Sequence, residues 1–220
     1  MEIQVSVIIV NYNTYSEILK CIGSLYSFTD DIFFEIIVVD NKSPERNIEY
    51  LSELFPEIIV LYSNNNRGFG AGCNMGARKS KGKYILFLNP DTIVKSNVLK
   101  EFYDFMERNT NTVAVSPNFI YPNGDQGYVF NYFPDIVWEI FELFGRGYGY
   151  RIKRFNKLIN TFSTERTPLK VDWNTGACLF VSASKFSDIN GFDENYFLYY
   201  EDVDLQLRLK EKGCEIYNLP

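Results

Sequence analysis

Apolar and polar residues alternate in blocks through the first half of the chain. Short apolar runs that are rich in β-branched residues are typical of strands buried on both faces of a parallel sheet. The predicted strands are residues 4–11, 33–41, 58–63, 84–89 and 113–119. The intervening pattern predicts helices over residues 13–28, 43–55 and 96–109. Because strands that alternate with helices form βαβ units, we predict a single α/β domain with a Rossmann-like, mostly parallel central sheet flanked by helices.

Two of the predicted helices begin with start signals. Thr14 and Glu17 fit the T-x-x-E capping-box pattern. Ser43 is a candidate cap for the helix over 43–55, with Pro44 in its first turn. We therefore expect both helices to be capped by a side-chain hydroxyl.

The pattern changes after residue 120. Residues 120–170 are rich in aromatic residues, Gly and Pro, and they show little periodicity. Regular spacing returns with a predicted strand over 171–183 and a predicted helix over 201–213. That helix has acids in its first turn and bases in its last, which suits the helix dipole.

The composition narrows the classes of function. The chain has 220 residues, of which 46% are apolar, and this is enough for one large domain with a sizeable core. Its formal charge of −6 disfavours general nucleic-acid binding. Because the sequence has no His, a catalytic His, a His-ligated zinc and a Ser-His-Asp triad are excluded within these residues.

Cysteine usage and the start of the chain predict the compartment. The four Cys residues are far apart and form no C-x-x-C pair, as expected of reduced cytosolic thiols. The first residues lack a basic segment and lead straight into a strand, so we expect no signal peptide. No apolar run approaches the roughly 20 residues that span a bilayer. These features predict a cytoplasmic protein.

Polar residues end three of the predicted strands, in the sequences VNYN, VVDN and LNPD. Ligands of open α/β sheets bind beyond the carboxyl ends of the strands, so these ends predict a shared crevice. Asp40 could accept hydrogen bonds from a ribose or a base there, but Asp is also common in turns. Pro90 cannot donate to a sheet ladder, so it ends its strand and places Asp91 at the crevice. Asp91 could hold Mg²⁺ if a diphosphate supplied the other ligands, or it could belong to a simple turn.

The glycine-rich residues 64–83 are reminiscent of phosphate-binding motifs but fail two spacing tests. Cys73 takes the place of the third Gly of the dinucleotide fingerprint, and Tyr84 takes the place of the P-loop Ser or Thr. Glycines would still let main-chain amides approach an anion, and Arg67 could pair with a phosphate. The alternative is a flexible turn with a solvated Arg67.

Three acids lie close together at the start of the last predicted helix: Glu201, Asp202 and Asp204. Acids at a helix N-terminus stabilise the helix without any further function. One of them could instead be a general base, because clustered like charges raise a carboxyl pKa. The spacing does not decide which of the three it is.

Five stretches, taken in order, resemble the family 2 glycosyltransferases of the GT-A fold, particularly their rhamnosyltransferase-like branch. They are VSVIIVNYN, IIVVDN, NNRGFGAGCNMG, YILFLNPDT and TGACLFVSASKFSDINGFDENYFLYYEDVDLQLRLKEKG. The resemblance implies transfer of a sugar from a nucleotide-diphosphate sugar to an acceptor hydroxyl, with inversion, in cell-surface polysaccharide or glycolipid assembly. Residues 1–119 would form the nucleotide-sugar-binding half of the domain. Residues 120–220 would form its acceptor-binding half, with 120–170 as a variable insertion.

The resemblance also implies roles for individual residues. Asp202 would be the catalytic base, assisted by Glu201, and Asp91 would bind Mg²⁺ or Mn²⁺ as the last acid of the family's D-x-D motif. The nucleoside would contact Val10, Tyr12, Asp40, Arg67 and Asn89. The donor sugar and the acceptor would lie near Trp173, Thr175, Gly176 and Ala177.

Asn89 stands where many relatives have the first Asp of D-x-D. The N-P-D sequence is found in the rhamnosyltransferase-like branch and therefore favours dTDP-rhamnose as the donor. Relatives usually continue past IYNLP to a His that completes the metal site, so we expect the full-length protein to extend beyond Pro220. The Q-x-x-R-W motif of processive synthases is absent, which favours the addition of a single sugar.

Residues 136–157 combine an apolar stretch with a basic one. Between Arg146 and Lys170 there are seven Lys or Arg residues and one acid, Glu165. One interpretation is peripheral contact with the inner face of the membrane, where a lipid-linked acceptor would replace a free saccharide. The other is an acceptor-side insertion that packs its aromatic residues internally.

Two further classes of function stay open at this point. The chain could be a non-catalytic domain that binds a nucleotide-sugar. It could also be a nucleotidyltransferase, which would share the crevice and the metal. The stretch GFDENYFLYYED argues against the nucleotidyltransferase, because that chemistry needs no acceptor base there.

Overall fold

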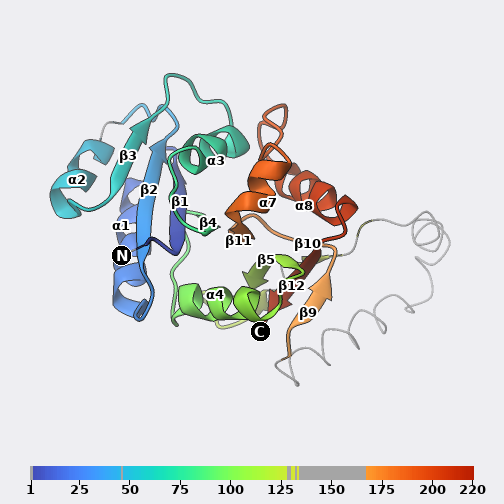
Figure 1. Ribbon diagram of the computed structural model, residues 1–220. Helices are drawn as coiled ribbons and strands as arrows, with labels where there is room; N and C mark the ends of the chain where they lie inside the picture. The colour runs from blue at the N-terminus through green and yellow to red at the C-terminus, as the bar shows by residue number, and fades with distance from the viewer. Residues whose placement is uncertain (1, 46, 128–129, 132, 134–166) are drawn as a thin grey trace, which may run out of the picture.

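An eight-stranded sheet runs through the centre of the molecule (Figure 1). The computed structural model describes residues 2–45, 47–127, 130–131, 133 and 167–220. The strands of the large sheet lie in the order β3-β2-β1-β4-β11-β5-β12-β9. Among these described strands, β11 and β9 run against the direction of the other six. The predicted α/β fold with a mostly parallel central sheet is therefore confirmed.

The strands of the large sheet are β1 (Val5–Asn11), β2 (Phe34–Asp40), β3 (Ile59–Tyr62), β4 (Tyr84–Leu88), β5 (Thr112–Pro117), β9 (Leu169–Val171), β11 (Cys178–Ser182) and β12 (Glu215–Leu219). Two small antiparallel pairs lie beside it: β6 (Phe119–Ile120) with β7 (Gln126–Gly127), and β8 (Phe130–Asn131) with β10 (Trp173–Asn174). The helices are α1 (Tyr15–Phe28), the short 3₁₀ helix η1 (Asn47–Tyr50), α2 (Leu51–Leu54), α3 (Phe69–Ala77), α4 (Val98–Arg108), α7 (Ala183–Asp188) and α8 (Glu201–Glu211).

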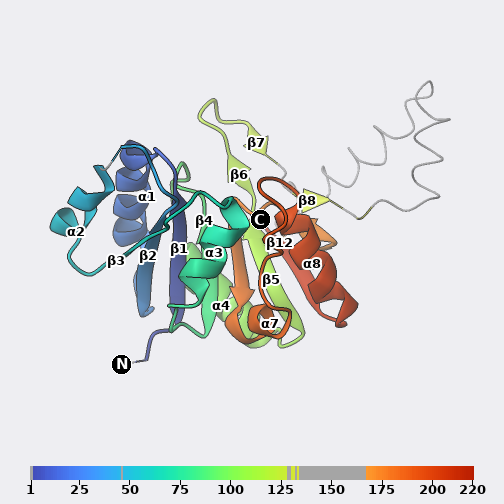
Figure 2. The same cartoon turned by 90° about the horizontal axis from the view of Figure 1, so that it is seen from above.

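Helices cover both faces of the sheet (Figure 2). Side chains of β1 alternate between the faces, as the strand period requires, so Val7 and Ile9 join one core and Ile8 and Val10 the other. Helices α1 and α4 pack on the first face, and α3, α7 and α8 pack on the second. The continuous apolar runs of the sequence are therefore explained by burial on both sides.

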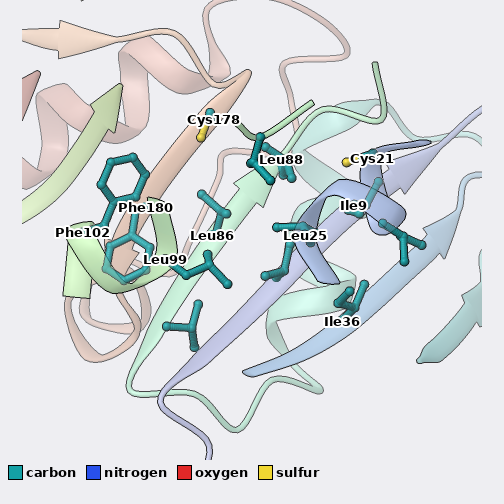
Figure 3. Close-up of a cluster of buried hydrophobic side chains, with 14 of the residues drawn as sticks. Ile9, Cys21, Leu25, Ile36, Leu86, Leu88, Leu99, Phe102, Cys178 and Phe180 are labelled. Atoms are coloured by element: carbon teal, nitrogen blue, oxygen red, sulfur yellow. The ribbon is translucent and has the colours of Figure 1, made fainter. Parts of the chain in front are cut away.

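Figure 3 shows the first of these cores at close range. Cys21 and Leu25 of α1 and Leu99 and Phe102 of α4 are almost fully buried there. They pack on strand residues Ile9, Ile36, Leu86, Leu88 and Phe180. This packing fixes the ends of β1 and β4, from which the candidate site is built.

The glycine-rich segment is not a flexible turn, because residues 69–77 form α3. Two of its glycines face β1. A Cβ on Gly72 would lie 2.8 Å from Val10 Cγ1, and a Cβ on Gly76 would lie 2.6 Å from Ile8 Cγ2. The glycines are therefore required for close packing between the helix and the sheet.

Neither predicted hydroxyl cap is formed. Thr14 precedes α1 but makes no side-chain cap, and its hydroxyl instead donates to Asn11 Oδ1 at 2.9 Å. Ser43 donates its hydroxyl to Asp40 Oδ1 at 2.6 Å, and regular structure begins only with η1 at Asn47. In both cases a polar side chain at the end of a strand competes for the hydroxyl.

The strand predicted over 171–183 is interrupted. Residues 169–174 form β9 and β10, and β11 begins at Cys178. The segment 175–177 between β10 and β11 contributes to the candidate site. Within the described part of the chain, no helix has the length and apolar character needed to cross a bilayer. The predicted membrane-surface element over 136–157 lies outside the described residues.

Candidate active site

Strands β1 and β4 separate toward their carboxyl ends, where the sequence predicted a crevice. Pairing of β1 with β2 continues to Asn11 and Asp40, whereas its pairing with β4 stops at Ile8 and Phe87. In open α/β sheets this kind of separation marks the ligand site. Tyr12, directly after β1, is 49% exposed, so its side chain is available to a ligand at this edge.

The loop after β4 presents Asp91 at the same edge. Residues 89–92 form a turn in which Asn89 O accepts hydrogen bonds from Thr92 N at 3.2 Å and from Thr92 Oγ1 at 2.7 Å. The Asp91 side chain is exposed. No hydrogen bond or ion pair is recorded between its carboxylate and the rest of the described chain. Asp91 is therefore free to bind a cation or a ligand hydroxyl.

Asp202 is held on the other side of the crevice, in the first turn of α8. Its Oδ2 accepts the Gly176 N–H at 2.6 Å, and its Oδ1 accepts the Val203 N–H at 2.9 Å. Burial raises the pKa of this carboxyl, and the two main-chain hydrogen bonds oppose that rise. Each carboxylate oxygen keeps a further lone pair, so Asp202 can still accept a proton.

Hydrogen bonds to the segment 175–177 involve both the turn that carries Asp91 and the side chain of Asp202. Asn89 N–H donates to Ala177 O at 2.8 Å, which ties the Asp91 turn to the segment before β11. Gly176, the residue before Ala177, holds Asp202. Hydrogen bonds therefore link Asn89 to Ala177 and Gly176 to Asp202, and Asp91 follows Asn89 by two residues in the same turn.

Glu201 differs sharply from its neighbour Asp202. It is 6% exposed, and its Oε2 is buried with no hydrogen-bond partner. Burial raises its pKa, and the charge of Asp202 adds to the rise. A Cβ on Gly70 would lie 3.7 Å from Glu201 Cβ, so this carboxyl lies beneath α3. Glu201 is therefore buried, whereas Asp202 is partly accessible.

The residues predicted to contact the nucleoside differ in availability. The Asp40 carboxylate accepts hydrogen bonds from Asn11 Nδ2 at 2.7 Å and from Ser43, so it closes a turn whatever else it binds. The Val10 side chain packs under α3, which leaves only its main chain for a ligand. Arg67 is 62% exposed and forms an ion pair with Glu194 at 2.6 Å. An anion would have to compete with that carboxylate.

The predicted sugar-pocket residues surround Gly176. Its missing side chain leaves room for Asp202 and Phe69, because a Cβ there would lie 3.2 Å from Asp202 Cβ and 3.6 Å from Phe69 Cε1. Thr175 and Ala177 are half-buried beside it. Trp173 lies further back, half-buried in β10.

Two features of this edge were not predicted. The first is the crossing of Gly68 and Phe197, where Phe69 N–H donates to Phe197 O at 3.2 Å. Gly68 has a φ of +92°, and a Cβ on it would lie 2.1 Å from Phe197 O. The second is a run of five exposed apolar residues, 196–200, in which Tyr199 and Tyr200 have positive φ. The sequence did contain a signal for the second feature, because the apolar run 196–200 directly precedes the acidic first turn of α8.

Asp91 is the one carboxylate placed for a metal at this crevice. Among the described residues, no group of three or more Cys, Asp or Glu side chains could hold an ion. A single exposed carboxylate without protein partners still fits a hard divalent cation that takes its other ligands from a bound diphosphate. The residues therefore fit a metal that is shared with the ligand, and they do not form a complete protein cage.

A groove in another part of the molecule is distinct from the candidate site. It has a volume of about 850 Å³ and lies between α3 and α7, with Arg78, Gly82 and Phe186 in its lining. None of the predicted site residues line it. The carboxyl edge is the candidate site because the acidic groups and the strand separation coincide there.

The chain matches known proteins along its whole length. Residues 6–178 match Glycosyl transferase family 2, and residues 149–220 match the N-terminal domain of galactosyltransferase. The rhamnosyltransferase WbbL of Escherichia coli K12 is 30% identical over 232 residues, covering 98% of this chain and 80% of that protein. The low-salt glycan biosynthesis hexosyltransferase Agl10 of Haloferax volcanii is 28% identical over 216 residues, covering 96% of this chain and 63% of that protein.

A solved structure shows the same fold. GalNAc-T7 with UDP, GalNAc and Mn²⁺ has a TM-score of 0.72 at 15% identity, covering 100% of this chain and 43% of that one. The fold is thus that of the GT-A glycosyltransferases. The chain belongs to glycosyltransferase family 2, as its sequence motifs predicted, and it spans less than two thirds of the length of Agl10 and of GalNAc-T7.

Proposed function

We propose that this chain transfers a sugar from a nucleotide-diphosphate sugar to an acceptor hydroxyl with inversion of configuration. The observation that carries the proposal is the connection from Asn89 through Ala177 and Gly176 to Asp202. It holds an exposed carboxyl and a partly buried carboxyl with a raised pKa at one crevice. A donor and an acceptor bound between them would meet the two groups that this reaction needs.

The donor would lie on the β1–β4 side of the crevice. Its nucleoside would contact Tyr12, the main chain of Val10, Asp40 and Asn89, with Arg67 near the diphosphate. Asp91 would hold Mg²⁺ or Mn²⁺ together with diphosphate oxygens. When bound, this ion offsets the charge that develops on the leaving group. The Mn²⁺ and UDP of GalNAc-T7 support a metal-bound nucleotide donor, and the similarity to the rhamnosyltransferase WbbL supports our preference for dTDP-rhamnose.

The acceptor would lie on the α8 side, against residues 173–177. Asp202 takes the proton of the acceptor hydroxyl, and that oxygen attacks the anomeric carbon from the face opposite the diphosphate. The bond from the anomeric carbon to the diphosphate oxygen breaks as the new glycosidic bond forms. A single displacement of this kind inverts the configuration and needs no enzyme nucleophile. We place a saccharide or lipid-linked saccharide on this side of the crevice.

The proposal is tested by measuring transfer from dTDP-rhamnose and other nucleotide-sugars in wild type, Asp91→Ala and Asp202→Asn. We expect both variants to lose at least 100-fold in rate, because each removes a group that acts on the reacting atoms, and removal of a general base alone costs roughly 10²–10⁴-fold. Asp202→Asn should keep its affinity for the nucleotide diphosphate. Full activity in Asp202→Asn would overturn the assignment of the base.

The same assay separates the two other classes of function. A domain that binds the donor without turnover in wild type would be a non-catalytic nucleotide-sugar-binding module. Release of pyrophosphate from a nucleoside triphosphate and a sugar phosphate would indicate a nucleotidyltransferase. Product stereochemistry, read by NMR at the anomeric centre, tests inversion directly.

A further inference from the structure

The buried carboxamide of Gln206 makes three hydrogen bonds, all of them to main-chain groups. Gln206 lies in α8, one turn after Asp202, and it has no exposed surface. Its Oε1 accepts the Asn174 N–H at 2.8 Å, and its Nε2 donates to Asn174 O at 2.6 Å. The same Nε2 donates to Asp202 O at 2.9 Å. The orientation of the amide is fixed because the Asn174 N–H can only donate.

These bonds pin the main chain that holds the candidate base. Asn174 is separated from Gly176, the donor to Asp202 Oδ2, by a single residue. Gln206 therefore joins both sides of the Gly176–Asp202 contact, because it binds the strand before Gly176 and the helix turn that carries Asp202. Asn174 is held from behind as well, by Asn218 Nδ2 at 3.3 Å from its Oδ1.

An apolar side chain would be the ordinary choice for a fully buried position in a helix. A buried amide is tolerated only when its donors and acceptor are satisfied, and here all of its main-chain partners belong to the two segments of the contact. A purely structural role would not require a side chain that addresses both Asn174 and Asp202.

We propose that Gln206 is a positioning residue that sets the proton affinity and orientation of Asp202 by holding segment 174–176 against the first turn of α8. The kinetic part of this inference rests on the proposed function. The titration of Asp202 does not, because it can be measured whether or not the chain transfers a sugar.

The test uses Gln206→Met, which keeps the length of the side chain and removes all three hydrogen bonds. The carboxyl ¹³C shift of Asp202 is followed against pH by NMR in the wild type and in the variant. We expect the pKa of Asp202 to rise by about half a unit or more, because the Gly176 N–H favours the charged carboxylate and would no longer be held in place. The acid limb of the transfer rate should move up by the same amount, with the donor KM unchanged.

Two further variants serve as an alternative and as a control. Gln206→Leu also removes the three hydrogen bonds and adds no charge near Asp202, so it is the alternative if Gln206→Met does not fold. Leu205→Ala is the matched control, because this buried neighbour belongs to the apolar core and has no polar group to lose. It should reduce stability without moving the titration of Asp202. An unchanged Asp202 titration in a folded Gln206 variant would overturn the inference. A shifted titration in a chain that shows no transfer would overturn only the proposed function.

Discussion

At the start of α8, two adjacent carboxyl groups have opposite surroundings. Asp202 accepts two main-chain hydrogen bonds at the crevice, whereas Glu201 lies beneath α3 with an unpartnered oxygen. The sequence motif predicted that both acids would take part in the chemistry. We propose the direct role for Asp202, and we expect the burial of Glu201 to affect the free energy of unfolding.

Glu201 should make the protein less stable as the pH rises. Burial raises its pKa above the ordinary value of 4.5, so the folded state binds this proton more tightly than the unfolded state. The stabilising contribution is complete below the unfolded pKa and is lost as the pH rises through the folded pKa. Glu201→Gln is neutral throughout, so its stability relative to wild type should improve between pH 4.5 and pH 7.5.

Urea unfolding at several pH values measures this difference. Glu211→Gln is the control, because Glu211 lies exposed in the last turn of the same helix. It should show a smaller change with pH than Glu201→Gln. A constant difference between wild type and Glu201→Gln over the whole range would show that Glu201 does not titrate differently in the folded protein.

At the scale of elements, the position of α3 depends on two close approaches, one along its length and one at its start. Gly72 and Gly76 let the helix lie against β1, and Gly68 lets its first turn pass under Phe197. Each approach brings a segment of the donor half against another part of the crevice. Both can be tested with glycine substitutions that have a matched control in the same chain.

Gly76→Ala should destabilise the fold by about 1–3 kcal/mol, because its Cβ would lie 2.6 Å from Ile8 Cγ2 in a packed core. Gly23→Ala in α1 is the control, since nothing lies within 4 Å of its added Cβ. That change should stabilise by about 0.4–1 kcal/mol through the unfolded state. Chemical denaturation measures both, and equal effects would show that close helix–sheet packing is not what requires Gly76.

Gly68→Ala tests the crossing with Phe197. The substitution combines a positive φ of +92° with a Cβ 2.1 Å from Phe197 O. Gly124 has a φ of +88° with nothing within 4 Å, so Gly124→Ala carries the backbone strain without the clash. We expect Gly68→Ala to lose more stability than Gly124→Ala. We also expect it to lose transfer activity, because the displaced loop leads directly into Asp202. Equal losses of stability and activity in the two variants would show that the contact between Gly68 and Phe197 does not contribute to the site.

The local sequence pattern predicted the positions of helices and strands better than it predicted which groups their side chains contact. The strands β1, β2 and β4 follow from continuous apolar runs, because burial on both faces leaves few polar positions. The helical structure predicted from Ser43 begins later, at Asn47, because Asp40 accepts hydrogen bonds from the Ser43 hydroxyl and main-chain N–H and holds the chain in a turn. For the segment 64–83 the sequence left open an approach of main-chain amides to an anion and a flexible turn, whereas Gly72 and Gly76 serve packing against Val10 and Ile8. Such contacts depend on tertiary neighbours that spacing does not reveal.

At the scale of the whole molecule, β11 brings the two halves of the chain together. It inserts antiparallel between β4 and β5, with Cys178 opposite Leu88, and so places Ala177 beside Asn89. The sequence predicted that both regions belong to one site only through the order of its motifs. No local period indicates that residues almost ninety positions apart are hydrogen-bonded. The strand order therefore had to come from the structure.

This arrangement predicts that a nucleoside diphosphate stabilises the fold more when a divalent metal is present, and that this extra stabilisation requires Asp91. A ligand at 100 times its Kd adds about 2.7 kcal/mol to the free energy of unfolding. For a chain of 220 residues, that corresponds to a rise in Tm of about 5–11 °C. A panel of nucleoside diphosphates with and without Mn²⁺, read by thermal shift, should therefore show a metal-dependent rise for the preferred base.

Asp91→Ala should abolish the metal-dependent part of that rise and leave the metal-free part, because the proposed nucleoside contacts come from β1, β2 and Asn89. Asp202→Asn should keep both parts, since its carboxyl faces the acceptor side. The two variants thus divide the crevice into a donor side and an acceptor side by binding alone, without any knowledge of the acceptor. A metal-dependent rise that survives Asp91→Ala would place the cation elsewhere and would separate the ligand site from the turn after β4.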